Sequence, residues 1–320
     1  MSLTLGFWAV QATGALAAGG LAWAVGRRLH RRLGLSHAAY GYWIGLWLLA
    51  VMPVLLSTLV ALWAPAPFVA LAPTLTMPLP VALELGDAGA AGGTVAATLW
   101  TRPSVATLLA AVYCAGLGIA LLRVLSGVRA TARLCRATTR IAPAAWPGPR
   151  SRACAQRLQS AGIACRLSTL PVSPFAVRWP RPVIVLPVSA MEQLEDRALS
   201  LILGHEAAHL KRRDPQRAGL MAVINALLWF NPFLPRLTAR VQLAAELRCD
   251  AQALAEDAHG GSAFATAYVR TLRLSAAAHA PATALTHRDL AGHEIRIRHM
   301  LHGDAAAPLA GSRRAMLLGS

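Results

Sequence analysis

The feature that most constrains this chain is a set of long stretches with few or no charged side chains near the N-terminus. Residues 1–26 contain no Asp, Glu, Lys or Arg, and residues 41–64 and 104–122 are two further apolar stretches. A helix of about 20 apolar residues is long enough to cross a bilayer. The sequence therefore predicts three transmembrane helices, at about residues 3–26, 41–64 and 104–125.

The charges agree with a membrane protein. Hydrophobic residues make up 56% of the 320 residues and charged residues only 14%, whereas about 25% is usual for a soluble domain. The net charge of +17 comes mainly from arginines. Two arginine clusters, Arg27–Arg32 and Arg123–Arg136, lie at the ends of apolar stretches that face one side, while the loop 65–103 is poor in bases. Basic segments stay in the cytosol, so the N-terminus and this loop are predicted outside. Because the arginines follow the membrane topology, direct nucleic-acid binding is not expected.

This topology divides the chain into a membrane domain, residues 1–126, and a cytosolic domain, residues 127–310. The loop 65–103 would be the long extracytoplasmic segment. It is predicted to pass a signal inward, and the alternative is a passive linker. Residues 311–320 place two arginines before an apolar stretch, which resembles the cytosolic end of a further span cut short. The five cysteines form no CxxC pair, so reduced thiols are predicted.

The second constraint is the sequence His-Glu-Ala-Ala-His at residues 205–209. Residues four apart share one face of a helix, so His205 and His209 can bind one metal ion. Glu206 is then placed to accept a proton from a metal-bound water. Ser189 and Glu192 predict the start of this helix as a capping box. The alternative is a chance match in a helix whose two histidines have only structural partners.

A catalytic zinc site needs a third protein ligand and an open position. Glu246 is the candidate, and Asp250 lies four residues later on the same helical face. Asp250 could accept a hydrogen bond from the far nitrogen of a zinc-bound histidine and fix its tautomer. Alone, such an acidic pair usually marks a solvated helix. With the upstream His-Glu-x-x-His motif, it predicts a zinc site of the gluzincin type, formed by His205, His209 and Glu246.

The remaining patterns predict the cytosolic fold. Residues 152–160 follow a Pro-rich break and favour a helix. Residues 166–187 favour short strands, clearest at 183–186. A strand directly before the motif suggests the sheet edge that holds extended substrates, and the alternative is an ordinary strand that covers a core. Further helices are expected at residues 236–257, 264–275 and 293–301. The predicted fold is thus mainly α, with three membrane helices and a cytosolic α+β peptidase domain that has a small sheet.

One segment gives conflicting signals. Residues 218–234 are apolar enough for a fourth span, but such a span would place Glu246 on the opposite side of the membrane from His205 and His209. Zinc–ligand bonds are about 2 Å long, and the hydrocarbon core is roughly 30 Å thick. The segment is therefore predicted to enter the membrane face and return, or to pack against the three spans, with a turn at Asn231–Pro232.

The strings HEAAHLKRRD, WFNP and AELRCD, in this order, resemble the BlaR/MecR family of membrane zinc metallopeptidases, the β-lactam-sensing antirepressors. SPFAVRWPRPVIVLP before the motif and EIRIRHML near the end are similar to the same family. The resemblance implies a multi-pass protein of the bacterial cytoplasmic membrane with its peptidase domain in the cytosol. It implies zinc on His205, His209 and Glu246, Glu206 as general base, and cleavage of a winged-helix repressor in antibiotic resistance.

The chain departs from the antibiotic sensors, because it shows no SxxK acylation motif of a penicillin-binding sensor domain. It is either part of a longer protein or relies on a separate sensor. Two alternatives stay open: a membrane quality-control protease of the HtpX or CAAX-protease kind, and a signalling scaffold with structural zinc. Tyr268 and His259 are candidates to stabilise the oxyanion, Arg212 and Arg213 suggest an acidic or nucleic-acid-bound substrate, and homo-oligomerisation is left open.

Overall fold

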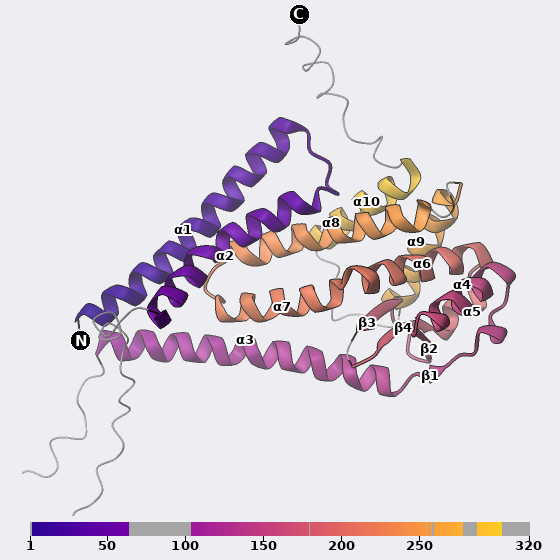
Figure 1. Cartoon of the computed structure of the whole chain (residues 1–320), viewed down its shortest axis with the longest axis horizontal. Coiled ribbons are helices and arrows are strands. Elements are labelled where there is room, and N and C mark those ends of the chain that lie inside the picture. Colours follow the sequence, from indigo (N-terminus) through magenta and orange to yellow (C-terminus); the bar gives the residue numbers. More distant parts are fainter. Residues whose placement is uncertain are drawn as a thin grey trace, which may run out of the picture.

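The computed structural model describes residues 2–63, 104–178, 180–255, 257, 259–277 and 287–302. In chain order its elements are α1 (Ser2–Leu33), α2 (Tyr40–Trp63), α3 (Val105–Arg136), β1 (Thr139–Arg140), a 3-10 turn (Pro143–Ala145), α4 (Pro149–Ser160), β2 (Ala164–Ser168), β3 (Phe175–Arg178), β4 (Pro182–Pro187), α5 (Val188–Gln193), α6 (Asp196–Arg212), α7 (Asp214–Leu227), α8 (Phe233–Ala255), α9 (Gly261–Ala277) and α10 (His287–His302). The N-terminal helices extend to one side of the sheet-containing part (Figure 1). The fold is mainly helical with one small mixed sheet, as predicted.

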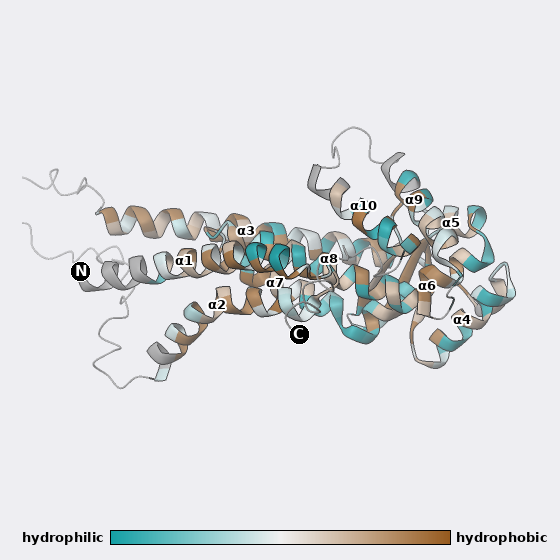
Figure 2. Ribbon diagram, turned by 90° about the horizontal axis from the view of Figure 1, so that it is seen from above, coloured by the Kyte–Doolittle hydropathy of each residue, from teal (hydrophilic) through white to brown (hydrophobic). Residues whose placement is uncertain are grey.

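Two helices of the described part are long and apolar enough to cross a membrane, residues Tyr40–Leu59 of α2 and the whole of α3. α3 begins where Ser104 caps it, its hydroxyl accepting the Thr107 N–H at 3.2 Å. None of its 32 residues is buried, and most of its leucines and valines are exposed. Figure 2 shows that hydrophobic residues follow one another along much of α3. An exposed apolar helix is expected where lipid is the solvent.

α1 forms a helix of 32 residues, but it is not one of the two helices that meet these criteria among the described residues. A third span therefore stays a prediction. The predicted domain division after residue 126 falls inside α3, which continues to Arg136, and stays a prediction as well. The proposed signalling loop, residues 65–103, and the apolar end, residues 311–320, lie outside the described residues.

The apolar segment 218–234 turns back on itself instead of forming one helix. It supplies most of α7, the turn and the start of α8, which form a helical hairpin. Asn231 in the turn is completely buried. Its side-chain amide donates to the Ala15 carbonyl at 2.8 Å, and its Oδ1 accepts the Phe233 N–H at 3.0 Å. The hairpin therefore packs against the N-terminal helices, and its turn lies at the predicted position.

A second core joins this hairpin to the membrane helices. Trp43 and Trp47 of α2 are buried against Leu234 and Leu237 of α8. The Trp47 indole N–H donates to the Thr238 hydroxyl at 3.0 Å. Tyrosine and tryptophan bury large apolar areas while keeping one polar partner. The first half of α8 is therefore fixed to α2.

The sheet has the strand order β1-β2-β4-β3. β2 and β4 are parallel, while β1 and β3 pair antiparallel with their neighbours. Ile184, Val185 and Leu186 of β4 are completely buried. The expectation that the strand before the motif forms the sheet edge was wrong, because β3 folds back along β4 and takes the edge position.

The helix that carries His205 and His209 starts later than predicted. The Ser189–Glu192 capping box was wrong: α5 ends at Gln193, Leu194 is extended with φ −97° and ψ 143°, and α6 begins at Asp196. The Asp196 carboxylate accepts the N–H groups of Arg150 and Ser151 at 2.9 and 2.8 Å, and so caps α4. This contact between distant segments holds Asp196 at the start of α6, after the break between α5 and α6. The spacing of residues along the chain does not reveal such a contact.

α7 leads away from α6 and α8 returns beside it, so Glu246 lies at the same end of the hairpin as His205 and His209. We expect cysteines introduced at Arg236 and Gln242 to resist a membrane-impermeant maleimide added to intact cells. Glu84→Cys, in the loop predicted to be outside, is the positive control, and labelling after lysis shows that each cysteine is reactive. Rapid labelling of Arg236→Cys or Gln242→Cys in intact cells would separate Glu246 from the histidines and overturn the site.

Candidate metal centre

The structure brings His205, His209 and Glu246 together from two helices. α6 carries both histidines on one face, and α8 crosses it to supply the glutamate. The two Nε2 atoms lie 3.1 Å apart. The Glu246 Oε2 lies 3.4 Å from Nε2 of His205, and its Oε1 lies 3.4 Å from Nε2 of His209.

These distances suit a zinc ion. Ligand atoms bound at about 2.0–2.1 Å in a tetrahedron are roughly 3.3 Å apart. The three separations in the structure, 3.1, 3.4 and 3.4 Å, lie close to this value. Two imidazole nitrogens and a carboxylate are also the donor set of many catalytic zinc sites. The residues therefore fit a zinc ion that keeps one position open.

Each histidine contacts a carboxylate through its other nitrogen. Nδ1 of His205 lies 2.8 Å from Oδ1 of Asp250, the residue predicted for this place. The two atoms are close, although the contact lacks the alignment of a hydrogen bond. Nδ1 of His209 makes a hydrogen bond of 3.0 Å with Asp214. Such partners keep the proton on Nδ1 and leave Nε2 free for a metal.

These partners also change the pKa values of the two imidazoles. Burial lowers the pKa of His205, but Asp250 and Glu246 outweigh it and raise the pKa to about 8. Burial likewise opposes the charged form of His209, yet hydrogen bonds to Asp214, Cys249 and Glu246 raise its pKa as well. The surrounding carboxylates thus favour positive charge at the place where a metal ion would supply it.

Glu206 is buried on α6 between the two histidines in sequence and lines the same cavity. Burial raises the pKa of its carboxyl group, although the nearby His205, His209 and Arg296 act in the opposite direction. A raised pKa makes the carboxylate a stronger base near neutral pH. This position and environment are those of a general base.

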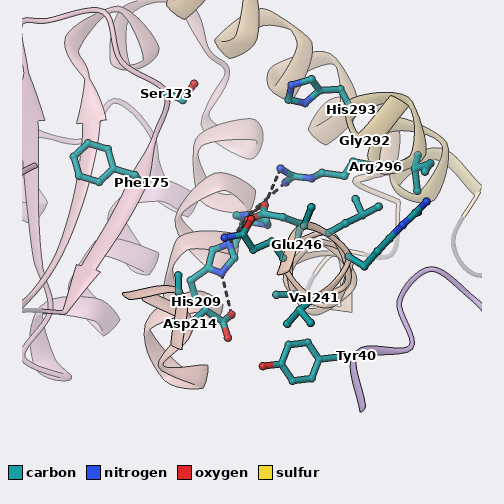
Figure 3. A pocket seen from close by; sticks show the side chains of 18 of the residues that line it. Tyr40, Ser173, Phe175, His209, Asp214, Val241, Glu246, Gly292, His293 and Arg296 are labelled. Atoms are coloured by element: carbon teal, nitrogen blue, oxygen red, sulfur yellow. Dashed lines mark hydrogen bonds and ion pairs between the residues drawn. The ribbon is translucent and has the colours of Figure 1, made fainter. Parts of the chain in front are cut away.

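Arg296 of α10 is the residue that the sequence reasoning missed. Its Nη1 lies 2.7 Å from Oε2 of Glu246 (Figure 3). Its Nε and Nη2 donate to the two oxygens of Asp250 at 2.9 and 2.8 Å. Nη2 is also 3.5 Å from Nε2 of His205. Burial alone would raise the pKa of both carboxyl groups. The charge of Arg296 is the largest of the opposing effects, and the pKa of each carboxyl group is lowered. Arg296 thus compensates the buried Asp250 and the half-buried Glu246 and borders the metal position.

Of the two oxyanion candidates, only Tyr268 lines the cavity. Its hydroxyl makes a hydrogen bond of 2.6 Å with Nδ1 of His293 and accepts one from Arg296 at 3.2 Å. Burial raises the pKa of Tyr268 to about 12, so the phenol keeps its proton at neutral pH. His259 is exposed in the turn before α9 and does not line this cavity, so it is not positioned for that role.

A second group of metal-type ligands shares His209. The Sγ of Cys249 lies 3.4 Å from Nδ1 of His209 and 3.7 Å from Oδ2 of Asp214. Burial raises the pKa of the Cys249 thiol. Only the thiolate binds zinc well, so this environment favours Cys249 as a protonated neighbour and not as a ligand.

The candidate centre opens into a cavity of about 1210 Å³. The cavity is lined by residues 173–176, which lead into the edge strand β3. It is also lined by Trp23 and Arg27 of α1, which are far from the candidate ligands in the sequence. Arg212 and Arg213 do not line this cavity; the Arg212 guanidinium donates to Gln252 at 2.9 Å. The volume exceeds the usual range for a small ligand, about 300–1,000 Å³, and suits a peptide segment.

A His-Glu-x-x-His helix, a glutamate from a second helix and exposed apolar helices define a membrane-associated metallopeptidase. The chain belongs to the family described as BlaR1 peptidase M56, whose model matches residues 7–301. The resemblance stated from sequence is thereby confirmed, and the family implies a metal ion, usually zinc. No curated protein matches the chain.

Two signals for the missed residues can be recognised in the sequence. Arg296 lies four residues before the buried Met300, so its charge falls on the apolar face of α10. A base on such a face indicates a buried acidic partner. Asp214 is followed by Pro215, a pair typical of a helix start, and this start follows the second histidine directly. Neither pattern names its partner.

If the three ligands hold the metal, substitutions should separate binding from chemistry. We expect His205→Ala, His209→Ala and Glu246→Ala to lose zinc and peptidase activity together. Glu206→Gln should keep one zinc per chain and lose about 10²–10⁴-fold in rate, because only the base is removed. Metal content by mass spectrometry distinguishes the two groups. Full activity in Glu246→Ala, or zinc loss in Glu206→Gln, would contradict the assignment.

Arg296 allows a matched stability test. Arg296→Met leaves Asp250 and Glu246 without their cation, and breaking a buried ion pair costs about 3–5 kcal/mol. Arg298→Met is the control on the same helix, because its pair with Glu294 is exposed and such pairs contribute about 0–1 kcal/mol. Denaturant unfolding of the metal-free protein in detergent measures both. Equal losses would mean that Arg296 does not stabilise the site.

Proposed function

We propose that this protein is a zinc-dependent endopeptidase anchored in the membrane, which makes a regulated cut in a cytosolic transcriptional repressor. The observation that supports peptide hydrolysis best is the convergence of His205, His209 and Glu246 beside the buried Glu206, at a cavity bordered by the edge strand β3. A structural zinc site is closed and needs no base. The intact Glu206 therefore weighs against a signalling scaffold.

The proposed chemistry assigns one role to each group. Zinc, when bound, would polarise the scissile carbonyl and lower the pKa of water toward 7. Glu206 accepts the proton of the attacking water and delivers it to the leaving amine. Tyr268, which remains protonated, and Arg296 are the donors on the cavity side nearest the ligands, and they would stabilise the oxyanion.

The edge of β3 supports binding of an extended substrate. β3 pairs with β4 through Phe175↔Val185 and Val177↔Val183, and no strand of the described chain pairs with its other edge. Phe175 and Ala176 line the cavity. An extended peptide can add to such an edge by main-chain hydrogen bonds, with side-chain pockets setting specificity. We propose that the substrate's scissile segment binds there as an additional strand.

A soluble repressor as substrate follows from the family and from the predicted topology. The basic ends of the apolar helices favour a cytosolic peptidase domain, where a transcriptional repressor is accessible. We also propose that the repressor has a winged-helix fold, that an external signal regulates its cleavage, and that the cleavage acts in antibiotic resistance. One alternative is quality-control cleavage of membrane proteins. It is supported by Trp23 of α1 and Met221 of α7, because these apolar side chains line the cavity near the N-terminal helices.

The two functions predict different products. With the full chain reconstituted in vesicles, we expect one discrete cut in the repressor encoded beside its gene. Glu206→Gln should abolish the cut, and an unrelated winged-helix protein of similar charge should stay intact. Gel analysis and mass spectrometry of the fragments locate the site. Progressive degradation of unfolded membrane proteins, with the repressor left whole, would favour quality control instead.

A further inference from the structure

A group of basic and aromatic side chains lies where α1, the α1–α2 connection, α2 and α8 meet, and it contains none of the candidate metal ligands. The His30 ring lies 4.8 Å from the His37 ring and 5.1 Å from the Trp43 ring, measured between centroids. The Arg240 guanidinium of α8 lies 5.7 Å from the centroid of the same indole. Arg27, one turn before His30, completes the group. We call these five residues the basic corner.

The positive charge of the basic corner is not neutralised by the described residues. No carboxylate of the described part of the chain forms an ion pair with Arg27 or Arg240. Both arginines line the large cavity. Burial lowers the pKa of Arg240, and the nearby charge of Arg27 lowers it further. Two guanidinium groups that line one cavity without an acidic partner create a site that favours an anion.

Two buried polar atoms at the basic corner point to the same ligand. Nδ1 of His30 and Nδ1 of His37 are shielded from solvent, and neither has a hydrogen-bond partner in the described structure. Burial lowers the pKa of His37 to about 4, with His30 and Arg240 adding to the effect, so this imidazole is neutral. A neutral imidazole still donates one N–H bond. Leaving buried polar groups unpaired is costly, and an acceptor oxygen would remove that cost.

The position of the basic corner selects the source of the anion. Trp43 lies in the first turn of α2, an apolar helix long enough to cross a membrane. Tyr40 and Tyr42 beside it are residues typical of the membrane–water interface. Basic pockets between helices on the cytosolic side bind the headgroups of anionic lipids. The ligand chemistry is a phosphate group, and lipid is its nearest source.

We propose that the basic corner is a binding site for the headgroup phosphate of an anionic phospholipid, with Arg27 and Arg240 as charged donors and the two histidines as neutral ones. Arg240 lies on α8 six residues before Glu246. A lipid bound there would tie the helix that carries the candidate metal ligand to the membrane surface. Arg27 and Arg240 line the same cavity as the candidate metal centre, but none of the five residues of the basic corner is one of its ligands.

The test uses the full chain in detergent, with the numbers of bound dioleoyl-phosphatidylglycerol and dioleoyl-phosphatidylcholine molecules measured by native mass spectrometry. One phosphatidylglycerol should bind in preference to phosphatidylcholine. Arg240→Gln should weaken its binding about fivefold or more, the effect expected for one base near a membrane surface. Arg27 is exposed, so Arg27→Gln should fold normally and give a similar loss.

The control is Arg28→Gln, which removes the same charge from the neighbouring, exposed position of α1. It should leave phosphatidylglycerol binding within about twofold of the parent chain. An equal loss in Arg28→Gln would mean general attraction to a basic surface, and equal binding of the two lipids would mean that no phosphate-selective site exists. Displacement of phosphatidylglycerol by low millimolar inorganic phosphate would assign the site to a soluble anion. Each of these three results would overturn the proposal.

Discussion

Compensation of buried charge governs the arrangement of this metal site. Glu246 and Asp250 lie one turn apart on α8, and Asp250 is completely buried. Removing carboxylates from water costs several kcal/mol each unless opposite charges and hydrogen bonds replace the water. α6 supplies the imidazole of His205, and α10 supplies the guanidinium of Arg296. Three helices are therefore held in one geometry by the need to neutralise two carboxylates.

The same helix connects the site to the membrane part. The first half of α8 packs against α2 through Leu234 and Leu237, and its second half carries Glu246. At 1.5 Å per residue, its 23 residues span about 35 Å. A displacement of the membrane helices would thus reach the ligand through one continuous element. This arrangement gives a physical route by which an external signal or a bound lipid could act on the candidate metal centre.

Local periodicity accounts for what could be predicted from sequence. The spacing of His205 and His209 fixes a shared helical face, and the spacing of Glu246 and Asp250 does the same on α8. The length of a zinc bond was enough to reject a fourth span at residues 218–234, and the structure shows a turn at Asn231. Each of these inferences needed only distances along one helix or across one ion.

The errors and omissions depended on contacts between distant segments. The helix start at Ser189 was wrong because Asp196 is engaged in capping α4. The prediction of the edge strand was wrong because β3 pairs with the outer side of β4 and takes the edge position. Arg296 lies 50 residues after Glu246 in the chain, so no local pattern links the two. Propensity and spacing describe single elements, whereas these features arise from packing.

The direct test of the central claim is X-ray absorption spectroscopy at the zinc edge of the purified, zinc-loaded protein. If His205, His209 and Glu246 hold the ion, the first shell contains only nitrogen and oxygen at about 2.0–2.2 Å. The competing group, His209, Asp214 and Cys249, would contribute one sulfur at about 2.3 Å. A shell without sulfur, unchanged in Cys249→Ala, is the predicted result. A sulfur neighbour that disappears in Cys249→Ala would contradict the account.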